Sequence, residues 1–200
     1  MCNLYRLSKP ASDLATFFKA SNEASGANVG AEVYPGYPSL VIAEGAVRSM
    51  VWGFPLSLKS KKTGKPLKPK PVNNTRTDKL DSFMWRYSFA ERRCLIPLNA
   101  WAEAEGAKGE MMRTWMRMAE RDVFAVAGIW RESDEWGSCY SMIMTDAGGP
   151  AAQVHDRMPV LLREDEYDQW QNGSPDQAKL LCRPWTDALV IDRTDELWRR

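Results

Sequence analysis

The sequence predicts an α+β fold in a single domain, with an antiparallel sheet or a partly closed β-barrel at its core and a few helices. Strand-like segments outnumber helix-like segments along the chain. The 200 residues are enough for one well-buried core, and no linker-like stretch divides them. Hydrophobic residues make up 44% and charged residues 26%, which is typical of globular proteins. We therefore expect residues 1–200 to form one domain.

Alternation of apolar and polar residues, or short apolar runs between turn signals, predicts the strands. A turn at Glu44-Gly45 separates two of them, which are expected to form a hairpin. Helical spacing predicts a helix at 78–87, and two more are expected, one capped by Ser12 and one ending near Gly173. The predicted strands are 2–7, 39–43, 47–54, 93–97, 111–118, 123–130 and 138–145, and the last helix is 164–171.

The formal net charge of +1 provides no global attraction for nucleic acid, so a DNA site would have to be a local basic patch. The segment 58–71 is such a patch, because it carries many lysines and no acidic residue. Together with other cations it is sufficient for a positive groove, although a run of charge also fits a solvated face. The lysines are Lys59, Lys61, Lys62, Lys65, Lys68 and Lys70, and the further cations are Arg76, Arg86, Arg92, Arg93, Arg113 and Arg117.

No secretory signal and no apolar stretch of membrane-spanning length are recognisable, so we expect a soluble cytoplasmic protein. Four cysteines lie far apart without a C-x-x-C pair, and the chain has one histidine. Disulfides, a metal site and a cofactor are therefore not expected. We expect a monomer.

Cys2 is the most informative single residue, because removal of Met1 would give it a free α-amine beside its thiol. An α-amine has a pKa about 2.5 below that of lysine, so its free-base fraction near neutrality is roughly 300-fold larger. The amine can attack an aldehyde, and the thiol can then close a five-membered thiazolidine ring. Taken alone, Cys2 also fits a small apolar residue at the start of a strand.

Motifs along most of the chain resemble the SOS response-associated peptidase (SRAP) family, also called abasic-site processing proteins. The resemblance implies an α+β SRAP-like fold and covalent capture of abasic sites in single-stranded DNA through Cys2. It also implies self-directed peptidase activity on Met1, lyase activity as an alternative, and association with the nucleoid when the protein is bound to damaged DNA. The motifs are Met1-Cys2, Val51-Trp52-Gly53-Phe54-Pro55, Asn74-Thr75-Arg76, Arg92-Arg93-Cys94-Leu95-Ile96-Pro97 leading to Glu103, and His155-Asp156-Arg157-Met158-Pro159.

The family's reacting groups correspond here to Cys2, Asn74, Glu103 and His155. The resemblance implies that His155 helps to open the deoxyribose ring and that Glu103 moves protons during ring closure. Asn74 would orient the amine and a sugar oxygen, although it also fits a turn. Arg76 would bind a phosphate beside the lesion, and the other predicted DNA contacts are Lys68, Lys70, Arg86 and Arg157.

Glu103 and Glu105 are both candidate acids, because strand alternation would place them on one face with Trp101. The motif favours Glu103, and partial burial beside Trp101 should raise its pKa. Two other functions stay open. One is a thiol peptidase using Cys2 and His155, and the other is a module that binds single-stranded DNA without a covalent bond.

Overall fold

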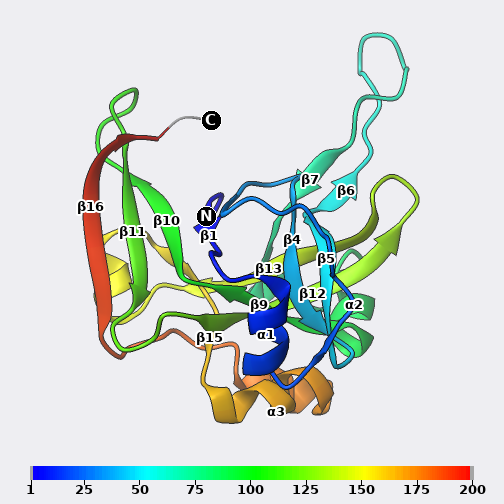
Figure 1. The fold of residues 1–200 in the computed structure, drawn as a ribbon. Coiled ribbons are helices and arrows are strands. Elements are labelled where there is room, and N and C mark those ends of the chain that lie inside the picture. The colour runs from blue at the N-terminus through cyan, green and yellow to red at the C-terminus, as the bar shows by residue number, and fades with distance from the viewer. Residues whose placement is uncertain (1, 199–200) are drawn as a thin grey trace.

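The computed structural model describes residues 2–198, so Met1, whose removal the sequence analysis predicts, lies outside the described residues. The strands form mostly antiparallel sheets, with short helices packed at one end (Figure 1). No helix among the described residues is long and apolar enough to cross a membrane.

The core of the molecule is a closed barrel. Its strands follow one another in the order β13-β12-β9-β4-β5, and β13 also pairs with β5 in parallel, at Cys139 with Val51 and Tyr140 with Trp52. This last pairing joins the two ends, which confirms the predicted α+β fold with a barrel-like core. The strands are β4 (Pro38–Ala43), β5 (Ala46–Trp52), β9 (Arg93–Leu98), β12 (Phe124–Ser133) and β13 (Gly137–Asp146).

A second sheet of five strands flanks the barrel and contains the start of the chain. In it β1 lies between β10 and β3, with Tyr5 opposite Trp101 on one side and Val33 on the other. The Tyr5 hydroxyl lies 2.5 Å from the Tyr140 hydroxyl on the barrel, and both side chains are buried. Residues near the N-terminus are therefore anchored to both sheets. The strands are β3 (Glu32–Val33), β1 (Tyr5–Arg6), β10 (Ala100–Glu105), β11 (Met112–Met118) and β16 (Leu189–Leu197).

A long hairpin projects away from the barrel (Figure 1). It consists of β6 (Phe54–Leu56), β7 (Lys70–Val72) and the intervening loop, and we call residues 54–72 the basic arm. Gly53 precedes the arm with φ of 122°, and a Cβ atom there would lie 2.5 Å from Cβ of Pro71. Only glycine therefore allows the arm to leave the barrel in this direction.

The remaining elements connect and cover the sheets. The helices are α1 (Ala11–Phe17), α2 (Arg86–Glu91), α3 (Tyr167–Asn172) and α4 (Pro175–Leu180), with 3₁₀ turns η1 (Thr77–Lys79), η2 (Gly149–Gln153) and η3 (Glu164–Glu166). The short strands are β2 (Ser21–Asn22), β8 (Asn74–Arg76), β14 (Arg157–Pro159) and β15 (Leu161–Leu162).

Two helix predictions need correction. The first helix begins at Ala11 with Pro10 as its N-cap, so Ser12 does not cap it. The predicted helix at 78–87 is wrong: the end of a 3₁₀ turn and a series of further turns occupy residues 78–85, and α2 starts at Arg86. The reason is that its apolar residues do not share one buried face, since Leu80 is buried whereas Phe83 is 88% exposed. The segment 164–171 does form η3 and α3.

Candidate active site

Cys2 lies in the interior at the beginning of the second sheet. Its side chain is fully buried, and its thiol Sγ donates a 3.5 Å hydrogen bond to the carbonyl oxygen of Leu4. Burial raises the pKa of the Cys2 thiol far above its usual value, and the negative charge of Glu103 raises it further. The sulfur is therefore a neutral thiol at neutral pH and needs a base before it can act as a nucleophile.

Two adjacent asparagines converge on the carbonyl oxygen of Cys2. Nδ2 of Asn74 donates to it at 2.7 Å, and Nδ2 of Asn73 donates to it at 2.9 Å. The amide oxygen Oδ1 of Asn74 is buried and has no hydrogen-bond partner among the described residues. Asn74 is thus fixed on one side and presents a buried acceptor on the other. The sequence analysis did not select Asn73, because residue type alone does not show that the folded chain places it beside Cys2.

Glu103 is the acid that the fold buries. It is 3% exposed on β10, and the backbone N–H of the preceding Ala102 donates a 2.9 Å hydrogen bond to the carbonyl oxygen of Leu4, two residues after Cys2. Burial raises the pKa of Glu103 to about 7, and the charge of Asp156 raises it as well. The predicted rise is confirmed. A carboxyl group with this pKa can both accept and donate a proton near neutral pH.

His155 lies in the loop between η2 and β14, with a side chain 27% exposed. Its Nδ1 accepts a 3.0 Å hydrogen bond from the backbone N–H of Arg157, and it lies 2.8 Å from Oδ1 of Asp156. Partial burial lowers the pKa of His155 below its usual value, against the opposing charge of Asp156. The neutral form of the imidazole therefore predominates at pH 7.

The fold brings the four predicted residues to one region. Asn74 contacts Cys2 directly, and Glu103 is close enough to Cys2 for its charge to shift the pKa of the thiol. Asp156, which influences Glu103 in the same way, is in contact with His155. Barrel strand β13 contributes to this arrangement, because both β8, with Asn74, and β14, just after His155, pair with it.

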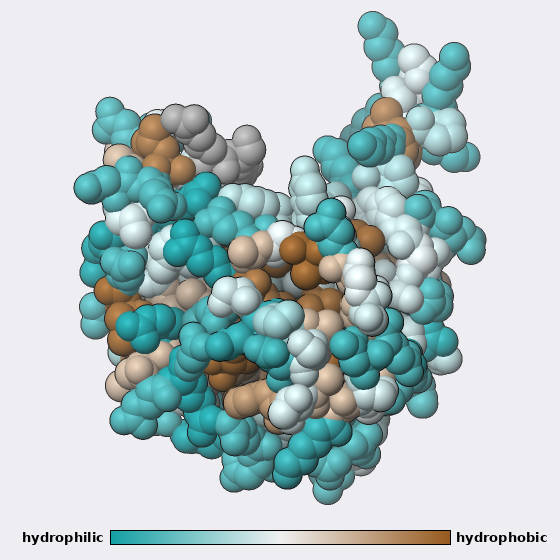
Figure 2. Space-filling view, viewed as in Figure 1, coloured by the Kyte–Doolittle hydropathy of each residue, from teal (hydrophilic) through white to brown (hydrophobic). Residues whose placement is uncertain are grey.

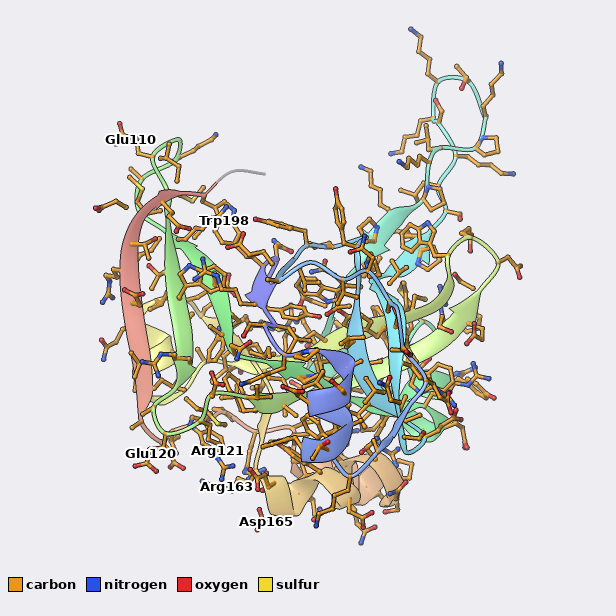
Figure 3. All side chains as sticks on the ribbon, in the orientation of Figure 1. Glu110, Glu120, Arg121, Arg163, Asp165 and Trp198 are labelled. Carbon is orange, nitrogen blue, oxygen red and sulfur yellow. The ribbon has the colours of Figure 1, made fainter. Side chains whose placement is uncertain are left out.

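The surface is hollowed on the side where β1 begins, between the basic arm and the outer ends of β10, β11 and β16 (Figure 2). Glu110 lies at the tip of the wall opposite the arm, and Trp198 lies on the inner side of that wall (Figure 3). Trp198 packs against a cluster that includes Leu4 and Trp115. The hollow thus has a basic wall on one side and an aromatic residue on the other.

The predicted DNA-binding cations occupy different environments. Lys68 and Lys70 are exposed on the basic arm, and all six arm lysines are exposed. Arg76 makes a two-pronged contact with Asp78 at 2.8 and 2.9 Å, so its charge is already balanced by an acid. Arg86 lies over the exposed Phe83 ring, and Arg157 contacts Asp146 at 3.2 Å. Arg76 and Arg157 are thus each paired with an acid, whereas the six exposed arm lysines make no ion pair with the described residues.

Arg93 does not contribute to a basic groove, contrary to the sequence analysis. It is 7% exposed, and its guanidinium donates to the carbonyl oxygens of Phe89, Ala90, Trp170 and Gly173. Arg93 thereby ties the end of α2 to the end of α3. Arg113 is also engaged, because it contacts Glu32 and Glu196.

The four cysteines are free thiols. Within residues 2–198, no group of three or more His, Cys, Asp or Glu side chains is arranged to hold a metal ion.

Comparison with known proteins identifies relatives of this chain. Two abasic site processing proteins of Bacillus subtilis, YoaM and YoqW, are each 26% identical to this chain, over 114 and 111 residues respectively. The match to YoaM covers 50% of this chain and 48% of the relative, so it spans about half the length of that protein, and the match to YoqW is similar.

Solved structures share the fold over nearly the whole chain. A protein from Bordetella bronchiseptica has a TM-score of 0.79 at 23% identity, covering 96% of this chain and 99% of its own. A protein from Bacteroides thetaiotaomicron has a TM-score of 0.77 at 18% identity, covering 96% and 91%. The family model described as SOS response associated peptidase (SRAP) matches residues 1–195. The chain belongs to the SRAP family.

Proposed function

We propose that this protein captures abasic sites in single-stranded DNA and forms a covalent thiazolidine through Cys2 after Met1 has been removed. The single observation that carries the proposal is the placement of Cys2, held by Asn74 and adjacent to Glu103, whose pKa is about 7. The names of the relatives YoaM and YoqW support abasic sites as the substrate.

The chemistry begins with the sugar. The neutral imidazole of His155 accepts the proton of the anomeric hydroxyl and passes it to the ring oxygen, which opens the deoxyribose and exposes its aldehyde. The α-amine of Cys2 then attacks the aldehyde carbon, and loss of one water molecule gives an imine. The thiol adds to the imine carbon while its proton passes to the imine nitrogen, and this closes the ring. The net reaction joins an aldehyde and an aminothiol with release of one water.

Glu103 fits the role of proton carrier in these steps. As a carboxylate it can take the proton that the attacking amine loses, and as an acid it can deliver a proton to the departing hydroxyl group. It can also accept the thiol proton, which matters because burial keeps the Cys2 sulfur protonated. The buried amide oxygen of Asn74 can accept a hydrogen bond from the amine or a sugar hydroxyl.

The hollow between the basic arm and the opposite wall suits a single DNA strand. The arm lysines would attract the phosphates, and Trp198 is a candidate for stacking on an unpaired base. A duplex would have to unstack and extrude the abasic nucleotide, whereas an unpaired strand avoids most of that cost.

We include a self-directed peptidase step in the proposal, in which the same groups use one water molecule to release Met1. Peptide hydrolysis in trans is less well supported, because a thiol peptidase requires an activated thiolate. The raised pKa of the Cys2 thiol indicates the opposite.

The proposal is tested by incubating the processed protein with an abasic single-stranded oligonucleotide, followed by denaturing electrophoresis and intact-mass measurement. We expect an adduct that survives heat and denaturant, with the mass of protein plus DNA minus one water. Cys2→Ala should abolish it, and Cys2→Ser should leave at most an imine that borohydride traps. A stable adduct formed by Cys2→Ala at full strength would contradict the mechanism.

A further inference from the structure

We propose that Asn73 is a positioning residue for Cys2, acting beside Asn74 by holding the Cys2 carbonyl from a second direction. This inference rests on the proposed function, because it concerns the orientation of the group that would react.

The amide nitrogen of Asn73 is committed to the first residues of the chain. Nδ2 donates to the carbonyl oxygen of Cys2 at 2.9 Å and to Oδ1 of Asn3 at 3.1 Å. An amide group has two N–H donors, so these two acceptors use both of them. Asn73 therefore has no side-chain N–H left for DNA, and its contribution is to place Cys2 and Asn3.

The backbone of Asn73 is itself rigidly held. Its carbonyl oxygen accepts a 3.0 Å hydrogen bond from Nε1 of Trp52 and a 2.9 Å hydrogen bond from the backbone N–H of Met142. Trp52 is fully buried on barrel strand β5, and Met142 lies on β13, the strand paired with β5. Asn73 thus links the barrel to the start of the chain, because its backbone is bonded to β5 and β13 and its side chain to Cys2.

The two asparagines together fix one peptide group. The Cys2 carbonyl receives donors at 2.7 and 2.9 Å, which match the two lone pairs of a carbonyl oxygen. This fixes the plane of the peptide that follows Cys2 and restricts where the α-amine and the thiol can point. A displacement of about 1 Å in a reacting group can reduce a rate by as much as 10²-fold, so such a restraint has kinetic value.

The experiment separates positioning from DNA affinity. The rate of single-turnover crosslinking is measured against the concentration of abasic oligonucleotide, giving a maximal rate and a half-saturating concentration. We expect Asn73→Ala to lower the maximal rate on the order of 10-fold, with the half-saturating concentration unchanged. Asn73→Asp keeps the shape but lacks the N–H donors, so it should be as slow as Asn73→Ala. Asn73→Gln keeps an amide and should recover part of the rate.

Asn3→Ala is the matched control, since it removes the second acceptor but leaves the bond to Cys2, and it should have a smaller effect on the maximal rate. If Asn73→Ala fails to fold, Asn73→Asp and Asn73→Gln still test the inference. An unchanged maximal rate in the folded Asn73 variants overturns the inference, and so does a loss confined to the half-saturating concentration. If the unaltered protein itself forms no stable adduct, the proposed function fails instead.

Discussion

Glu103 and Glu105 lie two residues apart on the same face of β10, yet their pKa values move in opposite directions. Burial raises that of Glu103 to about 7. Glu105 is more exposed, and hydrogen bonds from Thr114 and Arg193 lower its pKa despite some desolvation. The strand therefore presents one carboxyl group able to exchange protons at neutral pH and one that stays ionised in an ion pair.

This pair supplies its own matched control. We expect Glu103→Gln to slow adduct formation by roughly 10²-fold or more, the usual contribution of a positioned acid or base. Glu105→Gln should change the rate little, because that carboxylate accepts hydrogen bonds from Arg193 and Thr114 and stays ionised. Both variants should keep their affinity for DNA. The opposite pattern, with Glu105→Gln slow and Glu103→Gln normal, would assign proton transfer to the other acid.

The raised pKa of Glu103 also predicts how stability changes with pH. In the unfolded chain this carboxyl group loses its proton near its ordinary pKa of 4.5, whereas in the folded protein it keeps it until about 7. The unfolded state therefore binds fewer protons across this interval, and the free energy of unfolding falls as the pH rises through it. Glu103→Gln removes this effect and should be more stable than the unaltered protein at pH 8, on the order of 2 kcal/mol.

Urea unfolding of both proteins at pH 4.5 and pH 8 measures the difference. It should be small at the lower pH and fully developed at the higher one. A constant difference across the range would mean that another group, not Glu103, titrates between folded and unfolded states.

The basic arm should provide the salt-dependent part of DNA binding. Affinity for single-stranded DNA is measured against salt concentration in the Cys2→Ala background, where no covalent bond can form. Changing Lys61, Lys62 and Lys65 to glutamine should lower the slope of the logarithmic plot by about 2, since each phosphate contact contributes about 0.7. The completed adduct should not respond to salt.

A matched triple substitution outside the arm is available at Lys9, Lys19 and Lys179. Two of these lysines already contact acids, Lys9 with Asp122 and Lys179 with Asp81. This control removes the same formal charge and should leave the slope nearly unchanged. Equal slopes for the two triple variants would show that the arm acts only through net charge.

Arg93 should matter for stability and not for DNA. Arg93→Lys loses most of the hydrogen bonds to the carbonyl groups at the ends of α2 and α3, and hydrogen bonds from a charged donor contribute about 1.5–3 kcal/mol each. We expect a loss of about 2–4 kcal/mol in the free energy of unfolding. Arg86→Lys, at an exposed position, should stay within about 0.5 kcal/mol. If fully folded Arg93→Lys protein bound DNA more weakly than the unaltered protein, Arg93 would have a role in DNA binding after all.

Local patterns were sufficient to predict the main barrel strands. The apolar runs of β4, β12 and β13 were expected nearly at their observed bounds, and so was the turn between β4 and β5, where Glu44 and Gly45 both have positive φ. Strand β16 was not predicted, because its second half is largely charged and exposed, and it is stabilised by pairing with β11 far back in the chain. The parallel pairing that closes the barrel is likewise non-local.

The site was likewise predicted only in part. The resemblance to a family selected Cys2, Asn74, Glu103 and His155 as candidates, whereas alternation along a strand placed Glu103 and Glu105 on one face without showing which of them is buried. The part of Asn73 depends on where the folded chain places Cys2, so residue type alone could not indicate it. Arg93 was misplaced for the same reason, since an arginine in a motif gives no sign that four carbonyl groups surround it.

The position of β1 between two neighbouring strands has a mechanical consequence. With DNA attached at Cys2, tension on the DNA would enter the protein at one end of a strand that is bonded to β10 on one side and β3 on the other. Pulling along such a strand loads its hydrogen bonds together, in shear, instead of opening them one after another. The attachment would therefore resist detachment by force better than one on an exposed edge strand or at the tip of the basic arm.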